Sequence, residues 1–270
     1  MANKTKRSIV TGGAGFIGSA LVRGLLRAGH RVEVIDSLAT GNVRNLSEVK
    51  DQVVFHPCDI RDFAAIAPVL AGADRVFHLA ALPSVPKSIL NPVPSHEANI
   101  DGTFNVFRAA AEGKVGRVVY AASSSAYGDT EILPKVETMA PSPKSPYAVQ
   151  KLLGEYYAAV FSECFGLETV ALRFFNVFGP RQDPTSVYSG VLSIFLTCLI
   201  ERRSPTIYGD GSEAFDFVAV EDCGLANICA MKADTVDNFY NVGTGKRTSL
   251  KELADMLVEL TGCKQPINYA

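Results

Sequence analysis

The sequence has almost no excess of charge of either sign. Twenty-six Lys and Arg residues face 28 Asp and Glu residues, which leaves a formal net charge of −2. A protein with so little net charge has no overall field that would gather it onto nucleic acid or an anionic membrane. We therefore expect neither nucleic acid nor a membrane as partner, and any anionic ligand must be held by a local site.

The sequence also lacks a long apolar run. The longest, Val191–Ile200, has ten residues and includes Ser193 and Thr197, whereas a membrane-spanning helix needs about 20. The N-terminus is basic, but it continues as Ser8-Ile9-Val10-Thr11 and then glycine, without the apolar core of a signal peptide. We expect a core helix at Val191–Ile200 and a chain that stays in the cytoplasm.

Clustered cysteines are absent as well. The six cysteines form neither a CxxC pair nor a group with histidine. Scattered thiols in a reducing compartment usually pack as small apolar side chains. We therefore expect no disulfide and no metal site.

What the sequence does contain is an alternation of short apolar runs with longer stretches of helical period. This alternation is typical of a parallel sheet covered by helices. The predicted strands are Arg7–Thr11, Arg31–Asp36, Val53–His56, Arg75–Leu79, Arg117–Ala122 and Glu168–Phe174. The predicted helices between them are Phe16–Arg27, Phe63–Leu70, Pro94–Glu112 and Pro146–Cys164. Six strands joined by right-handed crossovers predict an α/β fold with a doubly wound, Rossmann-type parallel sheet.

The alternation breaks after Arg173. Loops rich in Gly and Pro then separate short strands from helices at about Val187–Arg202, Asp222–Lys232 and Ser249–Leu260. This pattern predicts a smaller C-terminal α/β substrate lobe, residues 176–270, partly interleaved with a first domain of residues 1–175. The chain ends ten residues after Leu260 without a clear closing element, and we expect this lobe to be truncated.

A glycine-rich turn joins the first predicted strand to the first predicted helix. Gly12, Gly15 and Gly18 have the GxxGxxG spacing. Such a turn needs glycine because its backbone takes a positive φ, approaches a pyrophosphate closely and packs the helix tightly on the strand. Asp36, 18 residues after Gly18, ends the second strand, where a carboxylate accepts both hydroxyls of an adenosine ribose. The pattern predicts a dinucleotide site, and Asp36 favours NAD because it repels the 2′-phosphate of NADP; Arg44 is the only nearby residue that argues otherwise.

Hydroxyl groups and a Tyr-x-x-x-Lys pair gather further along the predicted sheet. Ser123-Ser124-Ser125 follows the fifth strand, at the carboxyl edge where doubly wound folds bind ligands. Tyr147 and Lys151 open a helix, and their spacing of four puts phenol and ammonium on one face. The ammonium and a cationic nicotinamide ring would lower the pKa of the phenol, so that Tyr147 takes a hydroxyl proton and a serine relays it. The alternative is a surface Tyr and Lys on an ordinary helix beside a Ser-rich loop.

Taken together, these segments resemble the extended short-chain dehydrogenase/reductases of the nucleotide-sugar epimerase group. The matching segments cover nearly the whole chain: Thr11–Gly18, Asp59-Ile60, His78–Ala81, Asn99, Ala121–Asp129, Ser145–Lys151, Arg173–Pro180 and Tyr208–Gly211. Within the group, Ala81–Pro86 and Gly179–Pro184 most resemble UDP-N-acetylglucosamine 4-epimerases that also accept the corresponding uronic acid. The resemblance implies NAD as cofactor and a UDP-sugar as substrate.

The resemblance also implies roles for individual positions. The implied catalytic residues are Ser123, Tyr147 and Lys151. The implied NAD-binding residues are Gly12, Gly15, Phe16, Ile17, Gly18, Asp36, Asp59, Ile60, Ala80, Ala81, Asn99, Tyr147, Lys151 and Phe174. The implied substrate-binding residues are Ser84, Ser124, Ser125, Asn176, Val191 and Tyr208. Val191 and Tyr208 would line the uracil pocket, with plain core packing as the alternative, and His78 is expected to be a core histidine rather than a catalyst.

Two positions distinguish this chain within the group. Dehydratases and decarboxylases carry an acidic residue where this chain has Ser125, because eliminating water or decarboxylating a ketosugar needs an added acid or base. Hydroxyls alone suit transient oxidation and re-reduction, so the resemblance implies epimerisation. The group also uses an Arg to clamp the diphosphate where this chain has Phe215, and the loss of that contact would cost about 1.5–3 kcal/mol of binding.

We therefore predict an isomerase of carbohydrate metabolism, an NAD-dependent UDP-sugar 4-epimerase. Its substrate would be UDP-GlcNAc/UDP-GalNAc or the corresponding uronic acid, and its intermediate a 4-keto sugar. The alternatives are a redox-inert NAD-binding sensor or scaffold, a substrate-oxidising dehydrogenase, and another UDP-sugar-modifying enzyme such as a 4,6-dehydratase or decarboxylase. A homodimer is expected mainly from the resemblance, through helices Pro94–Glu112 and Pro146–Cys164, which carry apolar residues beyond one face.

Overall fold

The computed structural model describes residues 5–183, 190–234, 239–263 and 265–270 of the 270-residue chain. They form two compact units, each built from two segments. The first unit comprises Met1–Phe174 and Glu221–Val242, and the second comprises Phe175–Val220 and Gly243–Ala270. Pro184, and the beginning of the helix expected from Val187, lie outside the described residues.

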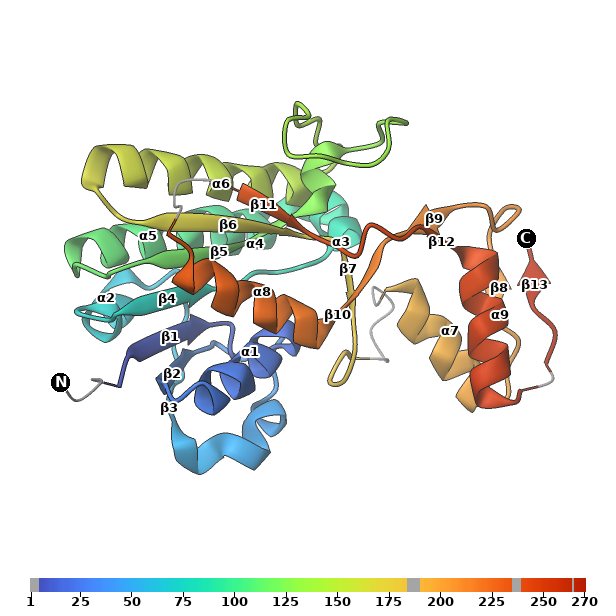
Figure 1. Cartoon of the computed structure of the whole chain (residues 1–270), viewed down its shortest axis with the longest axis horizontal. Helices are drawn as coiled ribbons and strands as arrows, with labels where there is room; N and C mark the ends of the chain where they lie inside the picture. The colour runs from blue at the N-terminus through green and yellow to red at the C-terminus, as the bar shows by residue number, and fades with distance from the viewer. Residues whose placement is uncertain (1–4, 184–189, 235–238, 264) are drawn as a thin grey trace. The chain divides into compact units, whose positions relative to one another are not determined.

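A seven-stranded sheet forms the centre of the first unit (Figure 1). All its pairings are parallel, in the order β11-β6-β5-β4-β1-β2-β3. The strands are β1 (Arg7–Thr11), β2 (Arg31–Ile35), β3 (Val53–His56), β4 (Arg75–His78), β5 (Val118–Ser123), β6 (Thr169–Phe174) and β11 (Phe239–Val242). From β1 the chain builds outward first through β2 and β3 and then, on the other side, through β4, β5 and β6. The doubly wound α/β fold expected from the sequence is confirmed, and its switch point between β1 and β4 is where such folds bind ligands.

Helices cover both faces of this sheet. They are α1 (Phe16–Arg27), α2 (Phe63–Leu70), α3 (Val85–Leu90), α4 (Pro92–His96), α5 (Gly102–Glu112), α6 (Pro146–Phe165) and α8 (Val220–Lys232). On one face, α2, α5 and α6 share an apolar core with the strands. On the opposite face α1 lies against α8 (Figure 1), so closely that a Cβ added at Gly24 would come within 3.1 Å of Ile228.

Two parts of the first unit differ from the prediction. Strand β11 was not predicted, because its sequence Phe-Tyr-Asn-Val places two polar groups, Tyr240 and Asn241, inside a short apolar run. The helix predicted over Pro94–Glu112 is interrupted by a π-helical turn at Glu97–Asp101. Asn99 lies in this turn and directs its amide to the backbone of Leu82 and to Gln150, which gives the irregular turn hydrogen bonds that a regular helix would not make.

The second unit consists, in its described part, of three two-stranded sheets and two helices. The strands are β7 (Asn176–Phe178), β8 (Thr206–Ile207), β9 (Ala214–Phe215), β10 (Phe217–Ala219), β12 (Thr248–Ser249) and β13 (Asn268–Tyr269). β10 pairs with β7 and β13 with β8 in parallel, and β12 pairs with β9 in antiparallel. Helices α7 (Val191–Ile200) and α9 (Leu250–Thr261) pack together around an apolar core. Helix α9 begins with a capping box in which Ser249 and Glu252 satisfy each other's backbone N–H groups.

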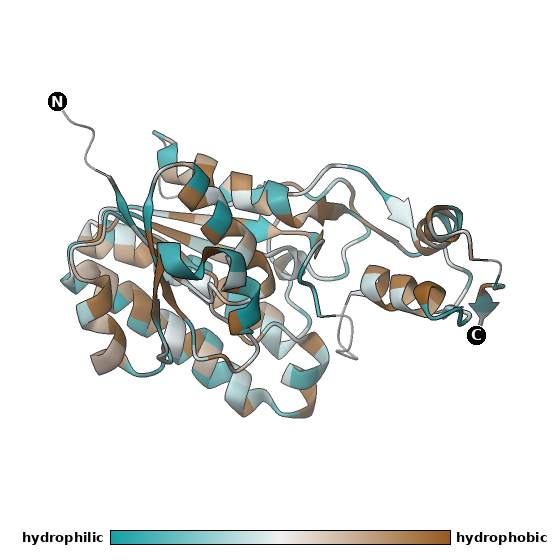
Figure 2. Cartoon of the chain, turned by 90° about the horizontal axis from the view of Figure 1, so that it is seen from below, coloured by the Kyte–Doolittle hydropathy of each residue, from teal (hydrophilic) through white to brown (hydrophobic). Residues whose placement is uncertain are grey.

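Helix α7 coincides with the longest apolar run of the sequence and is coloured as largely hydrophobic in Figure 2. Its Phe195 and Leu199 are buried in the core of the second unit, which confirms the expected core helix. Among the described residues, none of the helices combines the length and the apolar character that crossing a membrane requires.

Candidate functional site

The glycine-rich turn connects the end of β1 to the start of α1. Gly12 has a φ of +73°, and a Cβ added there would lie 2.7 Å from the backbone nitrogen of Ala80. A Cβ on Gly18 would lie only 2.1 Å from the carbonyl oxygen of Gly12. Glycine is therefore required at both positions, one for the backbone conformation and the other for the close packing of helix on turn. The turn leaves bare backbone at the N-terminus of a twelve-residue helix, which is an arrangement that binds phosphate groups.

Asp36 directly follows β2 and faces this turn. Its carboxylate accepts the backbone N–H of Ala14 at 2.9 Å and that of Leu38 at 2.8 Å, one on each oxygen. Burial raises the pKa of Asp36, and the two N–H groups oppose that effect. Each carboxylate oxygen keeps a second lone pair, so the group can still accept two further hydrogen bonds from a ribose diol.

The remaining predicted NAD-binding positions lie at the carboxyl ends of neighbouring strands or at the start of a helix. Phe16 and Ile17 open α1, Asp59 and Ile60 follow β3, Ala80 and Ala81 follow β4, and Phe174 ends β6 beside Ser123 in the ladder. Asp59 is paired with Arg61 at 2.9 Å, and this contact lowers the pKa of the carboxyl group.

Asn99 differs from the other predicted NAD-binding positions. Its Oδ1 accepts the backbone N–H of Leu82 at 2.7 Å, and its Nδ2 donates to Gln150 at 2.9 Å and to the Leu82 carbonyl at 3.2 Å. Both amide protons are thereby used within the protein. Asn99 therefore fixes the loop after β4 through Leu82 and has no free amide proton to donate to a cofactor.

The structure brings the predicted hydroxyl groups together with Tyr147. Ser123 ends β5, and Ser125 donates from its Oγ to the Oγ of Ser123 at 2.8 Å. Ser123 is in turn hydrogen-bonded to the phenol of Tyr147. Ser124 opens the short 3₁₀ helix Ser124–Tyr127 in the same segment. A continuous chain of three hydroxyls, from Ser125 through Ser123 to Tyr147, therefore ends at the candidate base.

In the protein alone, burial shifts the pKa values of both Tyr147 and Lys151. Burial raises the pKa of Tyr147 to about 12, although the Ser123 hydrogen bond acts in the opposite direction. Burial lowers the pKa of Lys151 to about 8, with Glu155 opposing that effect. Loss of hydration on burial is the main cause of the raised pKa of Tyr147 in the protein alone. The predicted lowering includes the charge of a bound nicotinamide ring and stays a prediction. The phenol becomes a base only when further positive charge reaches it.

Two of the predicted substrate-binding residues engage the protein backbone. Ser84 caps the N-terminus of α3 and accepts the N–H of Lys87 at 3.2 Å. Asn176, on β7, donates from its Nδ2 and its backbone N–H to the carbonyl of Asp216. Both side chains retain capacity for another hydrogen bond.

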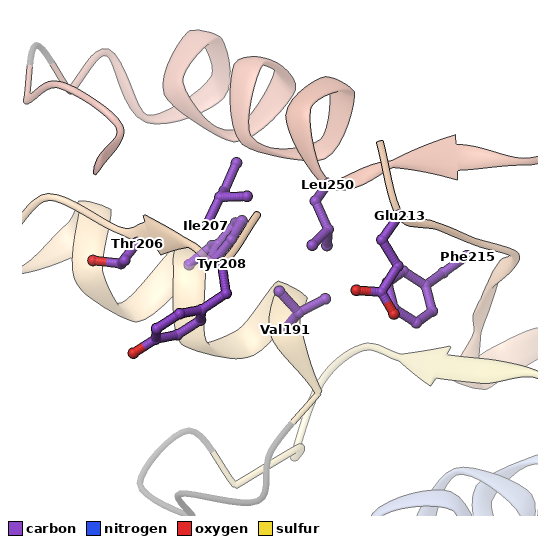
Figure 3. A pocket seen from close by; sticks show the side chains of 8 residues that line it. Val191, Thr206, Ile207, Tyr208, Glu213, Phe215 and Leu250 are labelled. Carbon is purple, nitrogen blue, oxygen red and sulfur yellow. The ribbon is translucent and has the colours of Figure 1, made fainter. Parts of the chain in front are cut away.

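Val191 and Tyr208 line one pocket of the second unit (Figure 3). Tyr208 is 80% exposed, so the alternative of core packing is wrong for this residue. The other lining residues are Phe195, Thr206, Ile207, Glu213, Phe215 and Leu250. The lining therefore contains one carboxylate and no cation, and Phe215, whose ring lies 5.8 Å from that of Phe217, is part of the wall.

His78 is a buried residue at the end of β4. His78 bonds to Thr11 at 2.8 Å and to Thr103 at 3.0 Å, and burial lowers its pKa to about 3. It is a neutral core histidine, as predicted. Within the described ranges, no group of three or more His, Cys, Asp or Glu residues has the geometry to hold a metal ion.

Sequence reasoning missed three residues that border these sites. Glu155 and Arg173 form a buried ion pair next to the Tyr147–Lys151 segment, and Glu213 lines the pocket of the second unit. The spacing of four between Lys151 and Glu155 was the available signal for the first of these. Nothing in the sequence pattern marked Glu213.

Comparison with known proteins adds an independent observation. A family model described as the NAD dependent epimerase/dehydratase family matches residues 8–243. The chain is 38% identical over 261 residues to the UDP-glucose 4-epimerase of Mycolicibacterium smegmatis, a match that covers 95% of this chain and 83% of that protein.

Solved structures show the same likeness. The UDP-N-acetylglucosamine 4-epimerase from Methanobrevibacter ruminantium M1, in complex with UDP-N-acetylmuramic acid, is similar with a TM-score of 0.95 and 37% identity, covering 99% of this chain and 86% of that one. The UDP-glucose 4-epimerase of Thermotoga maritima, solved with UDP-glucose, is similar with a TM-score of 0.93 and 34% identity, covering 98% of this chain and 85% of that one.

Proposed function

Because the chain belongs to the NAD dependent epimerase/dehydratase family, we propose that it is an enzyme that inverts the C4 centre of a UDP-sugar. The observation that carries this proposal is the hydroxyl chain from Ser125 through Ser123 to Tyr147, with Lys151 one helical turn further on. Relatives that are named UDP-glucose and UDP-N-acetylglucosamine 4-epimerases support it.

The residues of the first unit fit NAD. The turn at Gly12 and Gly18 has no room for side chains, and the carboxylate of Asp36 keeps lone pairs for a ribose diol. The backbone N–H groups of the turn would hold the pyrophosphate and Asp36 the adenosine ribose, with Tyr147 and Lys151 at the nicotinamide end. When bound, NAD supplies reversible two-electron oxidation and a positive charge on its ring.

Tyr147 carries out the proton chemistry in this proposal. Its phenolate takes the proton of the C4 hydroxyl while C4 is oxidised to a ketone, and the phenol returns that proton when the ketone is reduced on its other face. Ser123 and Ser125 extend the hydrogen-bonded chain over which the proton is shared. The positive charge of Lys151 stabilises the phenolate that Tyr147 must form.

The hydroxyl chain favours epimerisation over two related reactions. Eliminating water or losing carbon dioxide from a 4-keto sugar needs an acid or base beyond Tyr147. Segment 123–127 reads Ser-Ser-Ser-Ala-Tyr and carries no carboxyl group. A second reading, an NAD-binding sensor or scaffold without catalysis, is disfavoured by the intact contact between Ser123 and Tyr147.

We further propose UDP-GlcNAc/UDP-GalNAc, or the corresponding uronic acid, as the substrate, with the uracil at the pocket of Val191 and Tyr208. The apolar and aromatic lining of that pocket suits a nucleobase. In this proposal the first unit binds NAD and the second unit binds the uracil. The neighbour that is named a UDP-N-acetylglucosamine 4-epimerase supports the N-acetyl sugar.

Product analysis tests this proposal directly. The protein would be incubated separately with UDP-glucose, UDP-GlcNAc and UDP-GlcNAc uronic acid, and the products read by proton NMR at H1 and H4, with Tyr147→Phe as the inactive control. We expect a mixture of C4 epimers from UDP-GlcNAc or its uronic acid, approached from either epimer. Products that have lost water or carbon dioxide, or no turnover of any of the three sugars, would overturn the proposal.

A further inference from the structure

Helix α6 carries a third polar residue in line with Tyr147 and Lys151. Glu155 lies four residues after Lys151, as Lys151 lies four after Tyr147. Because an α-helix has 3.6 residues per turn, the three side chains lie on the same face. Lys151 and Glu155 are both buried, so their charges interact with little screening by solvent.

Glu155 is fixed from the other side by Arg173 of β6. The guanidinium donates from Nε to Oε1 at 2.8 Å and from Nη2 to Oε2 at 2.7 Å, and both side chains are almost fully buried. Arg173 is itself held between the ring of Phe239, 3.8 Å away, and the ring of Tyr127, 4.6 Å away. A two-point contact between groups packed on all sides gives the carboxylate a single orientation.

The surroundings of Lys151 contain no other anion among the described groups that face it. Its Nζ lies 4.8 Å from the centre of the Tyr120 ring on β5. His78 on β4 is kept neutral by burial. Tyr120 on β5 and Tyr147 on α6 both have raised pKa values and are uncharged. The Glu155 carboxylate is therefore the group that compensates the cost of burying the ammonium, and its interaction with Lys151 raises the pKa of that lysine.

We propose that Glu155 is a positioning residue for Lys151, and that its carboxylate, oriented by Arg173, keeps the buried ammonium charged next to Tyr147. This inference rests on the proposed function, in which the positive charge of Lys151 stabilises the phenolate. A buried ion pair that served only to stabilise the fold would not change the charge state of Lys151.

The charge of Lys151 can be measured without cofactor or substrate. The protein would be labelled with lysine carrying ¹³C at Cε, the Lys151 signal assigned by its absence in Lys151→Arg, and its titration midpoint followed by NMR. We expect Glu155→Gln to lower the midpoint by about one pH unit or more, because the variant removes the buried negative charge, one helical turn away, that raises the pKa of Lys151. Glu163→Gln is the matched control. Glu163 is exposed and lies on the same helix, about 18 Å from Lys151 along the helix axis.

Arg173→Gln should shift the Lys151 titration midpoint in the opposite direction. Glutamine keeps one donor to Glu155 but removes the cation that shares its charge, so the Lys151 midpoint should rise. Glu155→Asp, which keeps the charge, should bring the midpoint back toward the wild-type value. A general loss of packing would not shift the midpoint in opposite directions in different variants. Arg173→Gln and Glu155→Asp therefore still test the role of the Glu155 charge if Glu155→Gln fails to fold. An unchanged midpoint in both Glu155→Gln and Arg173→Gln overturns the inference.

Turnover gives a second readout that separates this inference from the proposed function. With the substrate identified, kcat should fall as the pH rises through the Lys151 pKa, and this alkaline limb should lie at lower pH in Glu155→Gln. If the wild type epimerises no UDP-sugar, the proposed function fails, while the NMR titration still decides the role of Glu155.

Discussion

At the scale of single residues, burial sets the charge states on which the chemistry depends. Tyr147 and Lys151 sit one helical turn apart, yet burial makes the phenol a weaker acid and the ammonium a stronger one. Near neutral pH the phenol of Tyr147 therefore stays protonated, whereas proton abstraction needs the phenolate. A positive charge brought next to the phenol favours the phenolate, so the protein alone is not poised for proton abstraction.

Tyr147→Phe should remove turnover and leave the fold intact. The phenol is the proposed base, and general base catalysis contributes about 10²–10⁴-fold, whereas Ser123→Ala removes one relay hydroxyl and should cost roughly tenfold. Initial rates with the NMR assay and circular dichroism of both variants check this. A kcat for Tyr147→Phe within a few-fold of wild type would mean that another group is the base.

Phe215→Arg should tighten the binding of UDP. The pocket is lined by the carboxylate of Glu213 and no cation, so a guanidinium there could contribute about 1.5–3 kcal/mol, or roughly ten- to a hundredfold in Kd, toward a diphosphate. Calorimetric titration of UDP into wild type and variant measures it, with Phe215→Leu as a control for lost ring packing.

The neighbouring carboxylate supplies a second comparison for this prediction. Glu213 could pair with the new arginine and cancel its charge, so the double variant Phe215→Arg/Glu213→Gln should bind UDP more tightly than either single one. Unchanged or weaker binding in both would show that Phe215 serves the packing of the wall and that the diphosphate is held elsewhere.

At the scale of helices and strands, backbone contacts decide which substitutions the first unit tolerates. Gly18→Ala would place a methyl group 2.1 Å from the Gly12 carbonyl oxygen and 2.8 Å from the Cα of Gly13, which forces the turn away from α1. We expect a loss of NAD affinity of at least tenfold and a stability decrease of about 1–3 kcal/mol. Gly24→Ala in the same helix meets only the flexible end of Ile228 and should leave both quantities nearly unchanged; equal effects of the two changes would contradict the argument.

The buried Glu33 carboxylate is the centre of a partly buried network that joins three strands and the end of a helix. Arg7 on β1 donates to it at 2.8 Å and His56 on β3 contacts it at 2.9 Å, while Arg7 also donates to the carbonyls of Val69 and Ala71 at the end of α2. The hydrogen bond from Arg7 is the main cause that lowers the pKa of Glu33 from 4.5 to about 2. Because the folded pKa lies below the unfolded one, the carboxylate stabilises the fold above about pH 4.5, and this contribution is lost as the pH falls toward 2.

Glu33→Gln should therefore lower the free energy of unfolding at pH 7 by about 1–3 kcal/mol and by much less at pH 3. Urea denaturation at both pH values measures the difference. Glu48→Gln is the control, because Glu48 pairs with Arg23 at the surface and such pairs contribute about 0–1 kcal/mol. A loss for Glu33→Gln that is equal at pH 7 and pH 3 would show that the ionised carboxylate is not the cause.

The elements of the sheet could be predicted because buried parallel strands and amphipathic helices leave different apolar periods. β1, β3, α1 and α2 have the predicted bounds, since a polar residue or a glycine stands at or within two residues of each of their ends. β11 could not be predicted because pairing with β6 makes it a strand despite Asn241 in its middle. The effect of burial on the pKa values of Tyr147 and Lys151 could not be predicted for a related reason, because burial depends on contacts that the local sequence does not contain.

At the scale of the whole molecule, exposed apolar side chains on the first unit bear on assembly. Phe104 on α5 and Tyr156, Val160 and Phe165 on α6 are between 38% and 63% exposed. Patches of this kind often mark an interface, and we propose that the two helices pair with those of a second copy.

Light scattering at micromolar concentration should therefore give the mass of a dimer. Val160→Lys should shift it toward the monomer, because a charge would be buried in the contact. Leu260→Lys, which changes an exposed apolar residue on α9 of the second unit, should leave the mass unchanged. A monomer for the wild type would refute the dimer.

The first unit includes the late segment Glu221–Val242, which is translated after most of the second unit. The first unit therefore cannot finish folding on the ribosome until that segment has been made. β6 is finished at residue 174, but the strand that covers its outer edge, β11, ends at residue 242. The buried Arg117 likewise donates to carbonyls of Ala230, Met231 and Ala233, all of which are translated later. At about 5–20 residues per second, the nascent sheet waits roughly 3–14 seconds with an open edge strand. During that interval it is a template for pairing with other chains, so the nascent chain most needs a chaperone while the second unit is being synthesised.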